Sequence, residues 1–231
     1  MEDELRLETI NYLKEFIREG RWETINKVLD QRTEYVTVVL EDIYQSHNAS
    51  AVLRSCDGFG INDVHVIENN CEFDPHVQIT LGADQWLDIN RYNTPNVDNT
   101  EICLSSLKEK GYQIIATTPH ERESNLNDLD VSKPTALVFG NELDGFSESV
   151  LKHADGFVKI PMYGFSESFN ISVSAAVCMY DLTTRVRQKK SNIDWKLTED
   201  RRSELLLSWL KSSIKAGEQL AEKFLKERET I

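Results

Sequence analysis

Short apolar runs rich in β-branched residues alternate with amphipathic stretches through the middle of the chain. The runs, each ended by glycine, proline or polar residues, are YVTVVL (35–40), DVHVIE (63–68), QIIATT (113–118), TALVFG (135–140) and FVKIP (157–161). Helical stretches lie between them, around 48–57, 100–110 and 146–154. This alternation predicts an α/β domain with a mostly parallel, centrally buried sheet.

Both ends of the chain have a helical pattern instead. Apolar residues at helical spacing from Leu5 to Leu29, interrupted at Gly20, predict one or two short amphipathic helices. After the last strand we expect a helix over 171–190, a polar break, and a final helix near 199–228. The expected organisation is an N-terminal helical extension, a central domain and a C-terminal helical extension, over residues 1–33, 34–190 and 191–231.

The composition is typical of a soluble globular protein, because 40% of the residues are hydrophobic and 28% are charged. No apolar run approaches the ~18 residues that a membrane span needs. The polar, acidic start MEDELRLETI is unlike a secretory signal peptide. We therefore expect a cytoplasmic protein without a membrane partner.

The cysteines and histidines do not form a metal-binding pattern. Four cysteines stand 15, 32 and 75 residues apart, without the CxxC spacing of zinc sites or redox pairs. The five histidines form neither an HExxH motif nor a close pair along the sequence. We therefore expect reduced cysteines and no metal.

Charge is unevenly distributed along the chain. The formal net charge is −13, but residues 185–231 carry 12 Lys and Arg against 8 Asp and Glu, a net of +4. This leaves −17 for residues 1–184, and an acidic protein repels phosphate backbones at long range. The C-terminal part opens with a basic cluster, Arg185, Arg187, Lys189 and Lys190. Charge alone is consistent either with a solvated helix face or with a surface for nucleic acid.

Ligands in parallel α/β sheets bind in the loops beyond the carboxyl ends of the strands. The first such loop leads into a predicted helix that carries Asn48 and Arg54. The two side chains can converge only if Asn48 caps the helix, because an offset of six residues is ~1.7 turns. The arginine fork suits a phosphate or a carboxylate, and a structural ion pair or a surface charge is the alternative.

Two later loops also carry candidate groups. In GNELDG (140–145), Gly140 permits close approach of the backbone to a ligand and Glu142 adds a carboxylate. The alternative there is a plain strand-to-helix connection. In SFNIS (168–172), Ser168 and Asn170 place polar groups at a helix start, and ordinary helix-capping residues are the alternative.

Several common site motifs are missing. No GxGxxG follows the first strand and no GxxxxGK[ST] occurs, so dinucleotide and P-loop nucleotide binding lack their signatures. A GxSxG elbow is also missing, which disfavours an α/β-hydrolase. A site that binds its ligand mainly through backbone groups in irregular loops remains consistent with the sequence.

Three segments together resemble the three motifs of the SPOUT methyltransferases, in order and in spacing. They are NASAVLRSCDGFG (48–60), LVFGNELDGFS (137–147) and IPMYGFSESFNISVSAAV (160–177). More narrowly, they are similar to the TrmH branch, which methylates ribose 2′-hydroxyls of RNA. The similarity covers about residues 34–190, and the flanking helices resemble those of tRNA-modifying members.

The resemblance implies a SPOUT fold with a C-terminal trefoil knot, an exception to the rule that chains do not thread themselves. It also implies a homodimer whose active site is completed across the interface, with S-adenosylmethionine as the cofactor. The residues that match cofactor-contacting positions are Thr117, Gly140, Ile160 and Phe169, where Phe169 replaces the usual leucine. The residues that match the catalytic cluster are Arg54, Asn48, Glu142, Ser168 and Asn170.

The implied reaction is in-line attack of a ribose 2′-oxygen on the sulfonium methyl group. Arginine is essentially always protonated, so we interpret Arg54 as a clamp for the target phosphate and the developing alkoxide rather than as a base. The expected partner is tRNA, bound through the basic cluster, and the leading target is guanosine 18 of the D-loop. The alternatives are rRNA, another tRNA position, or a non-catalytic RNA-binding protein, which the intact catalytic set disfavours.

Overall fold

The structure, a computed structural model, describes residues 2–118, 124–141 and 145–229. It divides into two compact units. One comprises residues 33–195, and the other joins residues 1–32 with residues 196–231. The two terminal extensions therefore belong to one helical unit.

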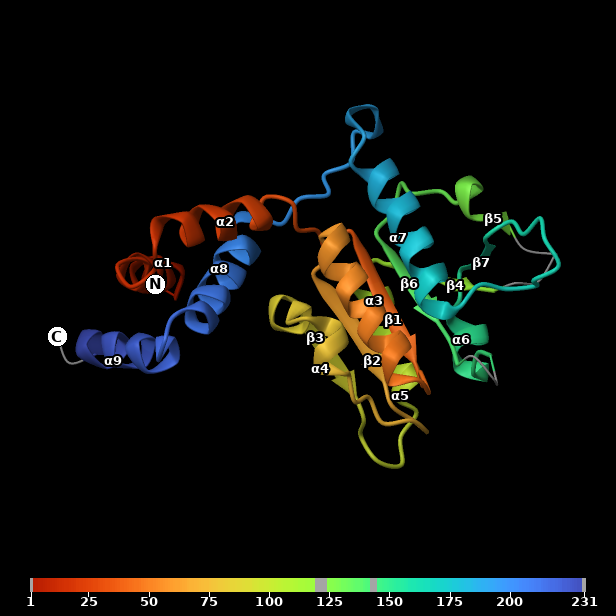
Figure 1. The fold of residues 1–231 in the computed structure, drawn as a ribbon, viewed down its shortest axis with the longest axis horizontal. Helices are drawn as coiled ribbons and strands as arrows, with labels where there is room; N and C mark the ends of the chain where they lie inside the picture. Colours follow the sequence, from red (N-terminus) through yellow and green to blue (C-terminus); the bar gives the residue numbers. More distant parts are fainter. Residues whose placement is uncertain (1, 119–123, 142–144, 230–231) are drawn as a thin grey trace. The chain divides into compact units, whose positions relative to one another are not determined.

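The larger unit is built on a parallel sheet. Its strands, in chain order, are β1 (Val36–Glu41), β2 (Asp63–Ile67), β3 (Asp88–Tyr92), β4 (Gln113–Thr117), β5 (Ser124–Asn125), β6 (Thr135–Phe139) and β7 (Gly156–Lys159). They lie in the order β3-β2-β1-β6-β4-β7-β5, and all described pairs are parallel (Figure 1). In the middle of the sheet, Val38 of β1 lies opposite Val64 of β2 and Leu137 of β6. The predicted α/β class and mostly parallel sheet are confirmed.

The sequence did not predict the strands at the two edges. β3 has the polar sequence DINRY, and β5 has only two residues. An edge strand pairs on one side only and stays partly exposed, so it needs no continuous apolar run. The five predicted strands are the inner ones, whose apolar runs follow from burial on both faces.

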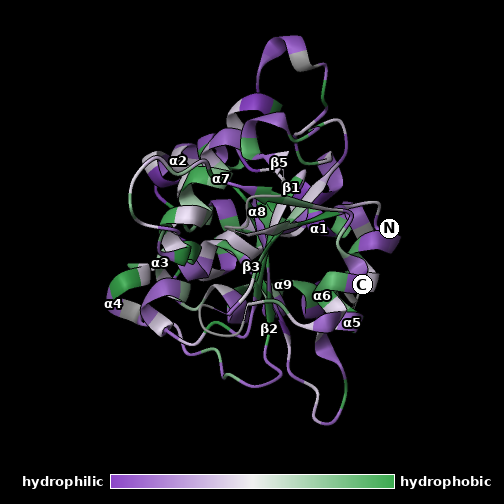
Figure 2. Cartoon of the chain, turned by 90° about the vertical axis from the view of Figure 1, so that its right-hand side faces the viewer, coloured by the Kyte–Doolittle hydropathy of each residue, from purple (hydrophilic) through white to green (hydrophobic). Residues whose placement is uncertain are grey.

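Helices cover both faces of the sheet. α3 (Ser46–Phe59) and α7 (Ile171–Val186) lie on one face, where Cys56 Sγ and Met179 Sδ are 3.6 Å apart (Figure 1). α5 (Asn99–Glu109) and α6 (Glu148–His153) pack on the other face, and the short helix α4 (Val77–Thr80) lies beside α3. Figure 2 shows the predominantly hydrophobic strands between these helices.

Alternation along β1 feeds two separate cores. Val38 belongs to the cluster that contains α3 and α7, and the next residue, Val39, belongs to the cluster that contains α5 and α6. Successive side chains of a strand point to opposite faces, so both faces of β1 must be apolar. Every residue of β1 is buried, as this arrangement requires.

The helical unit contains α1 (Glu2–Lys14), α2 (Glu19–Leu29), α8 (Glu199–Ser213) and α9 (Gly217–Glu229). The N-terminal break falls before α2, and Gly20 lies inside that helix. An Arg6–Asp200 ion pair joins α1 to α8, and the Arg32 guanidinium lies 5.1 Å from the centre of the Trp209 ring. These contacts hold the two ends of the chain together in one unit.

The single final helix expected over 199–228 is wrong, because the chain breaks between α8 and α9. Ala216 has a positive φ of 60°, which turns the chain. A Cβ on Gly217 would lie 2.3 Å from the Lys211 carbonyl oxygen, so only glycine fits where α9 starts. α7 also ends earlier than expected, at Val186, and a 3₁₀ turn, η3 (Lys189–Ser191), follows. Among the described helices, none is both long enough and apolar enough to span a membrane.

Candidate functional site

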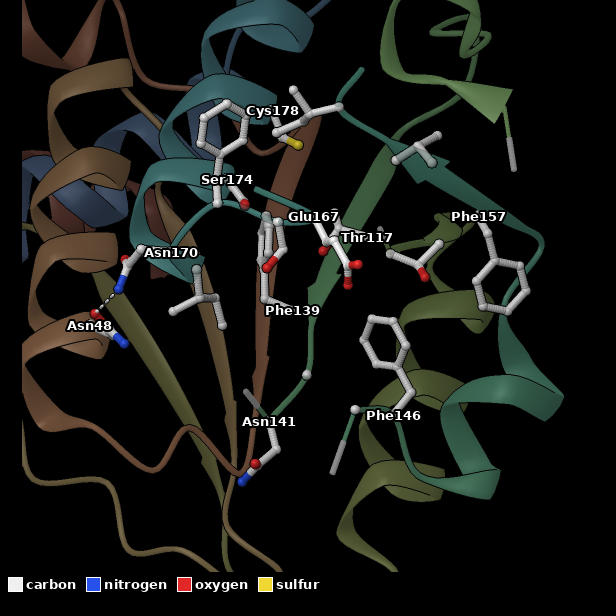
Figure 3. A pocket seen from close by; sticks show the side chains of 18 of the residues that line it. Asn48, Thr117, Phe139, Asn141, Phe146, Phe157, Glu167, Asn170, Ser174 and Cys178 are labelled. Atoms are coloured by element: carbon white, nitrogen blue, oxygen red, sulfur yellow. Dashed lines mark hydrogen bonds between the residues drawn. The ribbon is translucent and has the colours of Figure 1, made fainter. Parts of the chain in front are cut away.

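A cavity of about 900 Å³ opens at the carboxyl edge of the sheet. Its apolar wall includes Phe139 and Phe157, and its polar groups include Thr117, Asn48 and Asn170 (Figure 3). Because the strands are parallel, the loops that follow β1, β4, β6 and β7 all meet at this edge. A cavity therefore lies at the edge of the sheet where the sequence analysis expected ligand-binding loops.

A tight turn after β6 forms one wall of the cavity. Asn141 N donates to Gly145 O at 3.1 Å, and Gly145 N donates back to Asn141 O at 3.0 Å. A Cβ at Gly140 would lie 2.6 Å from Phe146 Cδ1 and 2.7 Å from Gly145 O. Gly140 is therefore required for the close packing of this turn, which leaves backbone groups beside the cavity.

The end of β1 anchors this turn on both sides. Asn141 Nδ2 donates to the Asp42 carbonyl oxygen at 2.8 Å. Ser147 donates through Oγ to Glu41 Oε1 at 2.6 Å and through its backbone N to Glu41 Oε2 at 3.2 Å. Glu41 is only 3% exposed, so its carboxylate is a buried acceptor for the chain that leaves the turn. The sequence analysis did not predict the Glu41–Ser147 contact, although the acidic residues Glu41 and Asp42 at the end of a buried strand indicated a polar role there.

Asn48 and Asn170 meet across the cavity edge although they are 122 residues apart in the sequence. Asn170 Nδ2 donates to Asn48 Oδ1 at 3.0 Å (Figure 3). Asn170 is the N-cap of α7, and its Oδ1 accepts from Ser172 N at 2.9 Å. This second bond fixes the amide orientation, so that the NH₂ group faces Asn48.

The condition for Asn48 and Arg54 to converge is not met. Gln45, rather than Asn48, occupies the N-cap of α3. Asn48 is 7% exposed and lines the cavity, whereas Arg54 is exposed and is absent from the described part of the lining. An offset of six residues separates Asn48 and Arg54 by ~9 Å along the helix axis, and their side chains point to different sides of the helix. Within one chain, Arg54 does not reach the group that contains Asn48 and Asn170.

The other predicted site residues divide into three groups. Those that line the cavity are Thr117, Gly140, Ile160, Ser168 and Phe169. Glu142 lies outside the described residues. In the basic cluster, Lys189 and Lys190 are exposed, while Arg185 and Arg187 are half-buried.

The two half-buried arginines bind other parts of the same chain. Arg185 donates to the carbonyl oxygens of Leu129 and Leu126 at 2.6 and 3.1 Å. Arg187 donates to Phe59 O at 2.9 Å, its guanidinium lies 4.9 Å from the centre of the Trp195 ring, and burial lowers its pKa. Both side chains thus have structural partners within the chain.

The cavity is poor in titratable groups. Burial raises the pKa of the Cys178 thiol to about 12, so this lining residue is a neutral thiol rather than a nucleophile at neutral pH. No cluster of three or more His, Cys, Asp or Glu side chains suited to a metal ion occurs in the described parts of the chain. The described lining therefore offers hydrogen-bonding groups and apolar surface.

The described unit is a parallel α/β domain in which a glycine turn and a helix N-terminus border one cavity. Domains of this class hold a small ligand at the edge of the sheet. The model of the SpoU rRNA methylase family matches residues 35–180. The chain belongs to this SpoU methylase family, which confirms the resemblance.

Individual relatives agree with this assignment. A tRNA (guanosine(18)-2′-O)-methyltransferase of Borreliella burgdorferi is 43% identical over 93% of this chain and 95% of its own. The Aquifex aeolicus TrmH/SpoU tRNA modifying enzyme superposes with a TM-score of 0.74 and 30% identity, over 85% of this chain and 98% of its own. The SpoU methyltransferase AviRb of Streptomyces viridochromogenes, solved with AdoMet, has a TM-score of 0.57 and 23% identity over 69% of this chain and 60% of its own. The similarity to AviRb shows a shared fold only.

Proposed function

We propose that this protein methylates a ribose 2′-hydroxyl of tRNA, at guanosine 18 of the D-loop, with S-adenosylmethionine as the methyl donor. The names of the relatives support both the reaction and the RNA. The observation that carries the proposal is the Asn48–Asn170 hydrogen bond of 3.0 Å at the edge of a cavity walled by the Gly140 turn. It brings two of the three motifs together at one ligand site, and the third motif supplies the turn.

The described residues fit S-adenosylmethionine. The cavity of about 900 Å³ is large enough for a nucleoside with an amino-acid tail, and small-ligand sites are commonly 300–1,000 Å³. Thr117, Gly140, Ile160 and Phe169 would hold this cofactor, with the close-packed Gly140 turn offering backbone groups. When bound, the cofactor supplies an electrophilic methyl group on a positively charged sulfur.

Replacing Gly140 with alanine is expected to weaken S-adenosylmethionine binding by at least about tenfold. The added Cβ would lie 2.7 Å from the Gly145 carbonyl oxygen and must displace the turn. Titration calorimetry measures the change. Gly58→Ala is the matched control, because a Cβ there meets nothing within 4 Å and should leave affinity unchanged. Equal affinity of Gly140→Ala and the natural protein would disprove the assigned role of the turn.

The chain's own groups have distinct roles in this reaction. Asn170, fixed by its cap bond to Ser172, orients Asn48, and together with Ser168 they position the target ribose at the cavity edge. Arg54 clamps the target phosphate and stabilises negative charge on the attacking oxygen. Glu142, outside the described residues, keeps the role that its motif position implies, as a support of the turn.

We propose that Arg54 acts in the cavity of a second copy, in a homodimer. An apolar stripe, Val173, Val177 and Tyr180, lies exposed along α7 at spacings of four and three residues, which is one helix face. Phe169, which lines the cavity, is 43% exposed beside the start of the same helix. A patch of this kind on a water-exposed helix is typical of an interface. A dimer through this face places a partner next to the cavity edge, where it can supply the missing arginine.

The trefoil knot and the cytoplasmic location belong to the same proposal. The family assignment and the match to solved relatives support the knot. The proposed tRNA substrate supports the cytoplasmic location.

Exchanging both Lys189 and Lys190 for glutamate is expected to weaken tRNA binding by at least about tenfold, with a smaller dependence on salt, because each lysine that contacts a phosphate releases counterions. Both side chains are exposed and lie beyond the far end of α7, about 24 Å from the cavity end of that helix. A tRNA that reaches them must span the length of the domain. Cofactor affinity should not change.

The control for this variant is Lys110→Glu with Lys133→Glu, which changes the charge equally. Both of these lysines are exposed and precede β4 and β6, at the opposite edge of the sheet from the cavity, so they match Lys189 and Lys190 in lying far from the cavity but are not part of the basic cluster. Filter binding or fluorescence anisotropy with labelled tRNA compares the two pairs. A similar loss for both pairs would mean that net charge, rather than this cluster, governs tRNA binding.

The function itself is tested by transfer of labelled methyl from S-adenosylmethionine to two unmodified tRNA transcripts. One carries guanosine at position 18, and the other carries 2′-deoxyguanosine at that position only. We expect label on the first and none on the second. Equal label on both would move the target to another position, and no label on either would direct the search to rRNA or to a binding role.

A further inference from the structure

Glu167 is the one charged side chain among the described residues that line the cavity, and it lies outside the catalytic cluster. It lies between β7 and α7, is exposed to solvent, and has no hydrogen-bond or ion-pair partner among the described residues (Figure 3). The adjacent residue, Ser168, lines the same cavity. A carboxylate to which the described residues supply no partner therefore borders the ligand site.

The surroundings of Glu167 favour a cation in this cavity. Four aromatic rings line it, those of Phe139, Phe146, Phe157 and Phe169, of which Figure 3 labels the first three, and aromatic faces attract positive charge. The unit that contains the cavity, residues 33–195, carries 12 Lys and Arg against 24 Asp and Glu, a net of −12. No described lining residue supplies a compensating positive charge. The local and the global fields thus have the same negative sign.

We propose that Glu167 makes the cavity selective for the positively charged methyl donor over its neutral product. This inference rests on the proposed function. S-adenosylmethionine carries a sulfonium, whereas S-adenosylhomocysteine carries an uncharged thioether in its place. In the transfer, the sulfur–methyl bond would break and its electron pair would stay on sulfur, while the ribose oxygen would gain the methyl group and lose its proton to water. Glu167 therefore attracts the ligand before transfer more strongly than the ligand after it, which favours replacement of the bound product by a new molecule of methyl donor.

Titration calorimetry with three ligands tests the charge argument on Glu167→Gln, a substitution that keeps the shape of the side chain. The ligands are S-adenosylmethionine, S-adenosylhomocysteine and sinefungin, whose amine places a positive charge where the sulfonium would be. We expect both cationic ligands to bind about threefold to tenfold more weakly, the size of an exposed charge interaction, and the neutral ligand to change by less than about twofold. The losses should shrink as salt is raised.

Glu109→Gln is the matched control. It removes the same charge from the end of α5, outside the described cavity lining, and should leave all three affinities unchanged. The proposal is overturned if the three ligands weaken equally, since Glu167 would then contact a part that they share. It is also overturned if no affinity changes, or if methyl transfer is lost while all affinities persist. A natural protein that binds neither S-adenosyl ligand would refute the proposed function itself, which is a separate outcome.

Discussion

Replacing Arg54 with lysine is expected to lower the rate of methyl transfer by about a hundredfold, the size of the loss when one donor to a developing oxyanion is removed. Lysine keeps the positive charge but not the planar fork, which can hold a phosphate through two parallel hydrogen bonds. The rate is measured under single-turnover conditions at saturating tRNA and cofactor, so that it reports the transfer step and not binding.

Two readouts separate this catalytic role from a structural one. Arg54 is exposed and has no hydrogen-bond or ion-pair partner among the described residues, so the thermal midpoint should stay within about a degree of the natural value. Cofactor affinity should also be unchanged, because Arg54 is absent from the described cavity lining of its own chain. Near-full activity of Arg54→Lys would show that charge alone suffices and that the clamp role is wrong.

The inner strands of the sheet were predictable because burial on both faces requires apolar side chains at successive positions. β1 and β6 are buried on both faces and therefore appear as unbroken apolar runs. The edge strand β3 has no such constraint, and only pairing with β2 makes it a strand. The break before Gly217 is a local turn: Ala216 has a positive φ, and the carbonyl oxygen of Lys211, six residues before Gly217, occupies the space of a Cβ. An apolar helical pattern that continues across the break cannot reveal that contact.

The candidate site was predictable as a set of motifs but not as a geometry. Loop position and glycine placement indicated where ligand groups lie, and the structure gathers Thr117, Gly140 and Asn170 there. The supporting carboxylate of Glu41 escaped notice because its partner, Ser147, is 106 residues away and only the fold brings them together. Helix periodicity left open whether Arg54 converges with Asn48, and within one chain it does not, because Gln45 rather than Asn48 caps α3.

If Arg54 completes the cavity of a partner chain, two inactive variants should restore each other's activity. We expect Arg54→Ala and Asn170→Ala to be nearly inactive alone, and their equal mixture, after dissociation and reassociation, to regain about a quarter of natural activity. Half of the reassociated dimers would be mixed. In each mixed dimer one cavity keeps its Asn48–Asn170 pair and faces an intact arginine, while the other cavity lacks both groups.

Exchange of subunits through the stripe that contains Val177 and Tyr180 can be followed by mass spectrometry of tagged chains. A mixture that exchanges fully but stays inactive would place Arg54 in the cavity of its own chain, because no mixed dimer would then hold a complete site. Restored activity requires the opposite arrangement, since it cannot arise from any single chain.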